Sequence, residues 1–157
     1  MPTRFPGGEL QPEGQGMMSR AAESQPLKVL IADDSAPVAE MLRDLISQAG
    51  RIEVVGTADS EASAMAAIRT LAPDAVVLDL QLKDGSGTDV IRAVRADAGL
   101  AATTRLLVTS NHTSPQLKAG CLELGAEAYF DKVKELAQLA ALLASLADEK
   151  ARAAGRP

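Results

Sequence analysis

Apolar residues gather in five short runs along the chain, each bounded by residues that favour turns. The runs are rich in Val, Ile, Leu and Ala, and they cover residues 26–32, 52–56, 74–79, 105–108 and 127–130. Short apolar runs of this kind, apolar on both faces, are typical of strands covered on both sides of a parallel sheet. The pattern therefore predicts five buried strands.

Between these runs the apolar residues recur three and four positions apart, which is the period of an amphipathic helix. The first such stretch has Ser35 as its N-cap and Pro37 in its first turn, and Gly50 ends it. Strands alternating with helices predict a parallel sheet covered by helices on both faces. The five predicted stripes are centred on Val38–Ile46, Met65–Leu71, Val90–Val94, Leu117–Leu124 and Leu136–Leu146.

The predicted elements fill one domain, over residues 27–147. Residues 1–26 contain four Pro and four Gly with little apolar patterning, so we expect a disordered N-terminal extension. Met17 or Met18 as the natural start of translation is an alternative. Residues 148–157 are expected to form a frayed basic tail, and nothing after the last helix predicts a second domain.

Composition excludes several classes of function. The net charge of −5 argues against direct binding to nucleic acid. A single cysteine, Cys121, excludes a disulfide framework and a cysteine-based metal site. No apolar run approaches the ~18 residues needed to cross a membrane, so membrane insertion is not expected.

Polar side chains stand where four of the five predicted strands end: Asp33 and Asp34, Asp79, Thr109 and Lys132. Because the carboxyl ends of parallel strands share one edge of the sheet, these groups should lie together. Carboxylates crowded in this way repel one another and favour a bound cation, and hard oxygen ligands suit Mg²⁺. The ion and Lys132 would hold a phosphate group. A carboxylate can itself act as the nucleophile toward phosphorus.

From about Lys28 to Leu146 the sequence resembles the receiver domain of two-component response regulators. The resemblance implies a flavodoxin-like α/β/α sandwich, with a five-stranded parallel sheet of order 2-1-3-4-5 and five helices. It also implies a cytoplasmic phospho-acceptor that catalyses only its own phosphorylation and dephosphorylation. The motifs that carry it are Asp33-Asp34, Asp79-Leu-Gln-Leu-Lys-Asp-Gly-Ser-Gly, Val108-Thr109-Ser110 and Gly125-Ala-Glu-Ala-Tyr129-Phe-Asp-Lys132.

The resemblance also assigns roles within the site. Asp79 would accept a phosphoryl group from a histidine kinase within a phosphorelay. Asp34, helped by Asp33, would bind Mg²⁺ together with Asp79, and the backbone carbonyl of Gln81 would complete the protein ligands.

The remaining roles concern the phosphorylated state. Thr109 and Lys132 would bind the phosphoryl oxygens, and Tyr129 would turn inward as Thr109 moves. A downstream protein would then recognise the face formed by the 113–125 helix, Tyr129 and the start of the last helix. The chain would act alone, through such a partner or by passing phosphate to a histidine phosphotransfer protein.

Some positions depart from the family pattern. Lys83 stands where the family often has Pro, and it either affects kinase choice and phosphate lifetime or is simply solvated. Val133 replaces the Pro that usually follows the final Lys. Because a cis bond before a non-proline residue is costly, we expect Lys132–Val133 to be trans. Ser110 replaces a common Ala.

Other functions for the same layers fit less well. A flavodoxin needs a Ser/Thr-rich phosphate loop after the first strand, where Asp33 and Asp34 would repel phosphate. A dinucleotide-binding domain needs a Gly-rich loop there, and an aspartate-dependent phosphatase needs Asp where Gln81 stands. The alternative that remains is a pseudo-receiver, an interaction scaffold that never takes phosphate. Retention of the acids, Thr109 and Lys132 argues against it.

Overall fold

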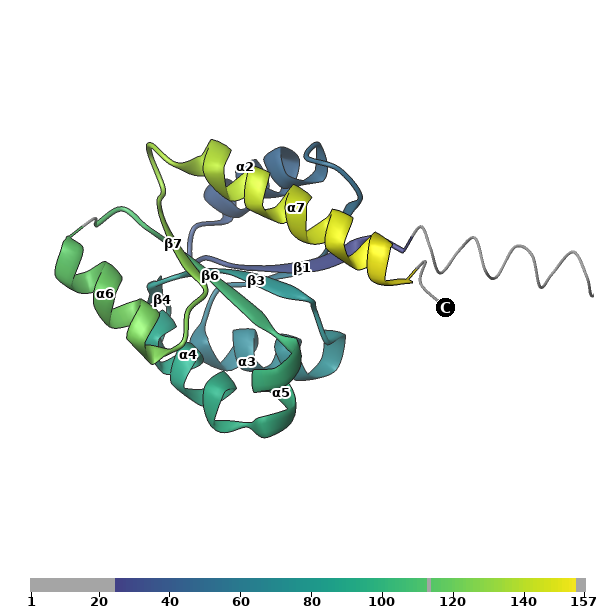
Figure 1. Ribbon diagram of the computed structural model, residues 1–157. Coiled ribbons are helices and arrows are strands. Elements are labelled where there is room, and N and C mark those ends of the chain that lie inside the picture. Colours follow the sequence, from purple (N-terminus) through teal and green to yellow (C-terminus); the bar gives the residue numbers. More distant parts are fainter. Residues whose placement is uncertain (1–24, 113, 155–157) are drawn as a thin grey trace, which may run out of the picture.

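The computed structural model describes residues 25–112 and 114–154, and a parallel five-stranded sheet forms its middle layer (Figure 1). The spatial order is β2-β1-β3-β6-β7, with every neighbouring pair parallel. This confirms the predicted order, since the labels skip two short hairpin strands. The sheet strands are β1 (Leu27–Ala32), β2 (Ile52–Ala58), β3 (Ala75–Asp79), β6 (Arg105–Ser110) and β7 (Ala128–Asp131).

Helices cover both faces of the sheet, as the alternating pattern predicts. In Figure 1, α2 and α7 lie on one face and the other helices lie on the opposite face. The helices are α2 (Ala36–Ser47), α3 (Glu61–Leu71), α4 (Gly87–Ala96), α5 (Ala98–Thr103), α6 (Pro115–Leu124) and α7 (Leu136–Ala154).

The core is aliphatic and divided by the sheet into two layers. Successive residues of β1 point to opposite faces, so Leu30 packs with α3 and α4 residues while Ile31 packs with α2 and α7 residues. Both side chains are completely buried. A sheet buried on both faces holds its strand ends rigidly, which fixes the side chains that follow them.

Polar caps begin the helices where the sequence predicts them. Ser35 accepts a hydrogen bond from the Val38 N–H at 3.3 Å, and Ser114 accepts one from the Leu117 N–H at 3.0 Å. Ser60 and Ser63 form a reciprocal capping box at the start of α3. These caps satisfy backbone N–H groups that would otherwise lack a partner.

Two small elements were not predicted. The described residues contain six helices rather than five, because α5 forms after an Asp97 cap. No residue of α5 is buried, so it leaves no apolar stripe in the sequence. The second element is an antiparallel hairpin of β4 (Gln81–Leu82) and β5 (Gly85–Ser86), directly after the central strand.

The predicted end of the last helix was wrong. Residues expected to form a frayed tail from position 148 instead continue α7 as far as Ala154. Lys150 holds this part of the helix against the amino end of the sheet. Its Nζ donates hydrogen bonds to Asp74 Oδ2 at 2.8 Å and to the Pro26 carbonyl oxygen at 3.0 Å. The expected disordered extension lies outside the described residues, apart from its last two positions. None of the helices that the structure describes is long and apolar enough to span a membrane.

Candidate functional site

The polar groups at the strand ends do meet at one edge of the sheet. Asp79 ends β3 and lies in register with Thr109 of β6, while Asp33 follows β1 and Lys132 follows β7. The Lys132 Nζ lies 2.7 Å from Asp33 Oδ2 and 2.9 Å from Asp79 Oδ2. One ammonium group therefore bridges two carboxylates that are 46 positions apart in the chain.

These three charges are withdrawn from solvent. The side chains of Lys132, Asp33 and Asp79 are 8%, 1% and 7% exposed. Burial raises the pKa of the Asp79 carboxyl above its ordinary value, although hydrogen bonds from Lys132 and the Gln81 N–H act in the opposite direction. Burial alone would lower the pKa of Lys132, but its bonds to Asp33 and Asp79 outweigh that effect and raise it. Lys132 therefore remains an ammonium ion.

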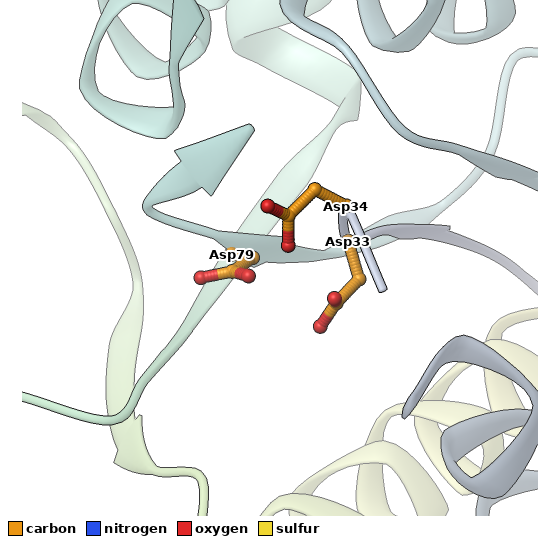
Figure 2. Close-up of side chains that lie close together, drawn as sticks. All are labelled: Asp33, Asp34 and Asp79. Carbon is orange, nitrogen blue, oxygen red and sulfur yellow. The ribbon is translucent and has the colours of Figure 1, made fainter. Parts of the chain in front are cut away.

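The acids have the geometry and chemistry of a divalent cation site. Figure 2 shows the carboxylates of Asp33, Asp34 and Asp79 close together at the ends of β1 and β3. One oxygen from each lies within 4.8 Å of the others, and Asp34 is exposed while the other two are buried. Oxygen donors with one side open to water fit Mg²⁺, which usually keeps several water ligands.

Thr109 carries an unpaired group beside these charges. The residue is 1% exposed, and among the described residues its hydroxyl has no hydrogen-bond partner. Most buried polar groups in proteins are hydrogen-bonded, so an unpaired hydroxyl in register with Asp79 requires an explanation. A phosphoryl oxygen on Asp79 would provide the missing acceptor.

The structure also gives the position of Tyr129, whose side chain was expected to turn inward as Thr109 moves. Its side chain is already buried, with the residue only 5% exposed, and its hydroxyl donates a hydrogen bond to the His112 carbonyl oxygen. The ring is therefore already buried in this arrangement, and its change of orientation with Thr109 stays a prediction. The ring ties β7 to the segment that follows β6. The bond went unpredicted because its acceptor is a backbone group, which leaves no trace in the sequence.

Gln81 lies in the hairpin with its carbonyl outside the strand ladder. The Gly87 N–H donates to the Leu80 carbonyl at 2.9 Å, which makes Gln81 and Ser86 a non-hydrogen-bonded pair. The Gln81 N–H donates instead to Asp79 Oδ1 at 3.1 Å. The Gln81 carbonyl therefore points away from the hairpin ladder.

Gly87 permits a close approach of the chain to the end of β3. A β-carbon at this position would lie 2.4 Å from the Asp79 carbonyl oxygen and 2.9 Å from the Leu80 α-carbon. Because these neighbours are backbone atoms, they cannot easily move aside. The sequence indicates only a tight loop here, whereas the structure shows that the start of α4 packs directly against the residues around Asp79.

The departures from the family pattern also have clear positions. The Lys83 Nζ lies 3.2 Å from Asp59 Oδ2, and both residues line a cleft of about 300 Å³ that also reaches Asp33 and Asp34. Lys83 is exposed and lines the same cleft as Asp33 and Asp34. The described residues contain no cis peptide bond, which confirms a trans bond at Lys132–Val133.

Comparison with known families agrees with this geometry. The family described as the response regulator receiver domain matches residues 29–144. The chain belongs to this family. The receiver match includes all of the sheet except the first two residues of β1, and it includes every residue of the site described above.

Individual relatives place the receiver within longer proteins. The chain is 35% identical over 112 residues to protein-glutamate methylesterase/protein-glutamine glutaminase 5 of Myxococcus xanthus, which covers 71% of this chain and 32% of that protein. It is 33% identical over 106 residues to the DNA-binding transcriptional activator DevR/DosR of Mycobacterium tuberculosis. That match covers 68% of this chain and 48% of DevR/DosR. The chain thus spans between about a third and a half of these relatives.

A solved receiver has the same architecture. The signal receiver domain of NarL from Mycobacterium tuberculosis superposes with a TM-score of 0.71 at 28% sequence identity. The match covers 78% of this chain and 97% of that domain. The receiver fold therefore accounts for the described sheet and its helices.

Proposed function

We propose that Asp79 accepts a phosphoryl group from a phosphohistidine of a histidine kinase or histidine phosphotransfer protein. The observation that best supports this is the buried Lys132 ammonium between Asp33 and Asp79, beside the unpaired Thr109 hydroxyl. Asp33, Asp34, Asp79 and the Gln81 carbonyl would hold Mg²⁺. The site thus has a nucleophile, a cation site and two donors for phosphoryl oxygens.

The proposed transfer forms one bond and breaks one. A carboxylate oxygen of Asp79 attacks phosphorus, and the phosphorus–nitrogen bond of the donor histidine breaks. Its electron pair stays on the imidazole nitrogen, which takes up a proton from solvent. Lys132 stabilises the phosphoryl charge because its ammonium is already positioned 2.9 Å from Asp79 Oδ2. Bound Mg²⁺ would neutralise further negative charge on the phosphoryl group.

The same groups link phosphorylation to a distant surface. A phosphoryl group adds about −1.5 to −2 charge at Asp79, to which the Thr109 hydroxyl can donate a hydrogen bond. In the sheet register Thr109 lies opposite Phe130, and Val108 lies opposite Tyr129. A shift at the end of β6 would thus reach β7 and the bond from Tyr129 to His112. We therefore place output on the α6–β7–α7 face, where a downstream protein would bind.

Acetyl phosphate and Mg²⁺ provide the direct test of the chemistry. Intact-mass analysis should show one phosphoryl adduct on the wild type and none on Asp79→Asn. Asp74→Asn is the matched control, because Asp74 also pairs with a lysine but lies at the other end of the sheet. Equal labelling of wild type and Asp79→Asn would reject Asp79 as the acceptor. An unlabelled wild type would favour the scaffold alternative.

The output face requires a separate experiment. Beryllium fluoride with Mg²⁺ imitates the phosphoryl group, and amide NMR shifts should then extend from the site to α6 and Tyr129. Tyr129→Phe removes only the hydroxyl that binds the His112 carbonyl, and it should weaken the response in α6 while leaving adduct formation intact. Shifts confined to the site loops in wild type would reject the switch and favour a simple phosphate relay.

A further inference from the structure

The hairpin that follows Asp79 is attached to the junction between β2 and α3 at two places. At its tip, the Lys83 N–H donates to the Asp59 carbonyl at 2.9 Å, next to the Lys83–Asp59 ion pair. At its base, the Ser86 N–H donates to Glu61 Oε1 at 3.1 Å. A short hairpin has little stability of its own, so these contacts fix where it lies.

The Glu61 side chain can approach the hairpin because the residue that it packs against, Gly85, has no side chain. A β-carbon on Gly85 would lie 2.2 Å from Glu61 Oε1 and 2.5 Å from Glu61 Cβ. Gly85 also has φ of +151°, a conformation that other residues rarely adopt. The glycine therefore permits both the turn of the hairpin and the approach of the glutamate.

The contact at Ser86 acts on the strand that carries Gln81. Ser86 and Gln81 lie opposite each other as a non-hydrogen-bonded pair, so the backbone groups of both point away from the ladder. The Ser86 N–H donates to Glu61 on one side, and the Gln81 carbonyl points away from the ladder on the other. Fixing Ser86 therefore fixes the orientation of the Gln81 carbonyl.

We propose that Glu61 is a positioning residue for the metal site, holding the hairpin so that the Gln81 carbonyl is oriented before Mg²⁺ binds. This inference rests on the proposed function, since it assigns Gln81 to the metal. Without Glu61 the base of the hairpin would have to be ordered when the ion binds, and the lost freedom would reduce affinity. The carboxylate of Glu61 acts here as a hydrogen-bond acceptor rather than as a ligand.

The test compares Mg²⁺ affinity in three variants of the full chain, measured by calorimetric titration. Glu61→Ala should weaken apparent binding about three- to fivefold, and Glu61→Gln should stay within about twofold of wild type because its amide oxygen still accepts from Ser86. Glu123→Ala, which removes an exposed helical glutamate on α6, should leave the affinity unchanged. In metal-free protein, exchange of the Ser86 amide hydrogen should be faster in Glu61→Ala alone.

Each other result overturns the inference. Equal weakening by Glu61→Ala and Glu61→Gln would show that charge near the acids matters, and not the hydrogen bond. Unchanged affinity in Glu61→Ala, with a wild type that binds Mg²⁺ and is labelled at Asp79, would reject positioning and leave the proposed function intact. A wild type that neither binds Mg²⁺ nor takes phosphate would overturn both.

A second variant covers the case in which Glu61→Ala does not fold. Gly85→Ala keeps the glutamate but places a methyl group where its carboxylate now lies. It should weaken Mg²⁺ binding by a similar factor and expose the Ser86 amide in the same way. Wild-type affinity in Gly85→Ala would contradict the inference independently.

Discussion

Each end of the sheet carries a lysine bonded to an aspartate, yet the two pairs differ in what surrounds them. At the amino end of the strands, Asp74 accepts from the Lys28 N–H and from Lys150 Nζ, both at 2.8 Å. Lys150 also donates to the Pro26 carbonyl, and the two side chains are 26% and 33% exposed. At the carboxyl end, the bridging Lys132 is 8% exposed.

The difference separates a partly exposed ion pair from a buried cluster in which one ammonium serves two carboxylates. At the amino end, one ammonium faces one carboxylate and nearby water screens both charges, so little remains for a ligand to satisfy. At the carboxyl end, two buried carboxylates share one ammonium, and the Thr109 hydroxyl has no hydrogen-bond partner in the part of the chain that the structure describes. That end retains unsatisfied binding capacity, which is what a site for a cation and a phosphoryl group requires.

The largest expected effect comes from breaking the pair at the carboxyl end. Lys132→Met leaves Asp33 and Asp79 buried without a counter-charge, so we expect a loss of about 3 kcal/mol in the free energy of unfolding. Denaturant melts measure this, with Lys134→Met, an exposed neighbour, as the control. Mg²⁺ should restore more stability to Lys132→Met than to wild type. A loss no larger than that of the control would contradict the buried pair.

The next effect is the response to the ion itself. At about ten times its dissociation constant, Mg²⁺ should stabilise the wild type by about 1.4 kcal/mol. Asp34→Asn should remove most of this gain, because it removes the exposed carboxylate of the cluster. Thermal melts with and without Mg²⁺ provide the measurement. Asp44→Asn, an exposed change on α2, should behave like wild type; the same loss in both variants would indicate nonspecific charge screening.

A smaller effect should follow from breaking the pair at the amino end. Lys150→Met should cost about 0.5–1 kcal/mol, since ion pairs that water reaches contribute little. The response to Mg²⁺ should not change. Denaturant melts at two Mg²⁺ concentrations test both statements. A loss equal to that of Lys132→Met would show that the two ends are not distinct in energy.

The smallest effect on stability is expected at Thr109. Thr109→Val removes a buried hydroxyl without a partner, so stability should stay within about 1 kcal/mol of wild type and rise rather than fall. The rate of phosphorylation or the rate of dephosphorylation at Asp79 should nevertheless differ from wild type, because a hydrogen-bond donor to the phosphoryl oxygens is lost. Unfolding melts and timed mass analysis together measure this separation. A large loss of stability would mean that the hydroxyl already has a partner.

Much of the site was predictable from strand ends. Asp79 and Thr109 follow apolar runs that leave little doubt about where strands end, and parallel strands bring those ends to one edge. Lys132 was predicted to lie near a phosphate. Its simultaneous contact with Asp33 and Asp79 depends on the side-chain conformation of the lysine, which the positions of these residues in the sequence do not determine.

Features without an apolar pattern escaped prediction. Helix α5 buries no residue, and the hairpin of β4 and β5 is too short to show alternation. The contact of Glu61 with Ser86 also left no signature, because an acid in the first turn of a helix is common for reasons of the helix dipole alone. The inward position of Tyr129 depends on a carbonyl group of a neighbouring loop.

Tyr129 has a practical consequence for spectroscopy. It is the chain's one tyrosine, and the sequence contains no tryptophan. Under excitation in the tyrosine absorption band, the emission of the unlabelled protein therefore originates from a single ring, whose hydroxyl is bonded to the His112 carbonyl. Any event that loosens that bond changes the brightness and polarisation of this light. Ordinary steady-state fluorimetry of the native chain thus reports on the region between α6 and β7, with no dye or engineered probe.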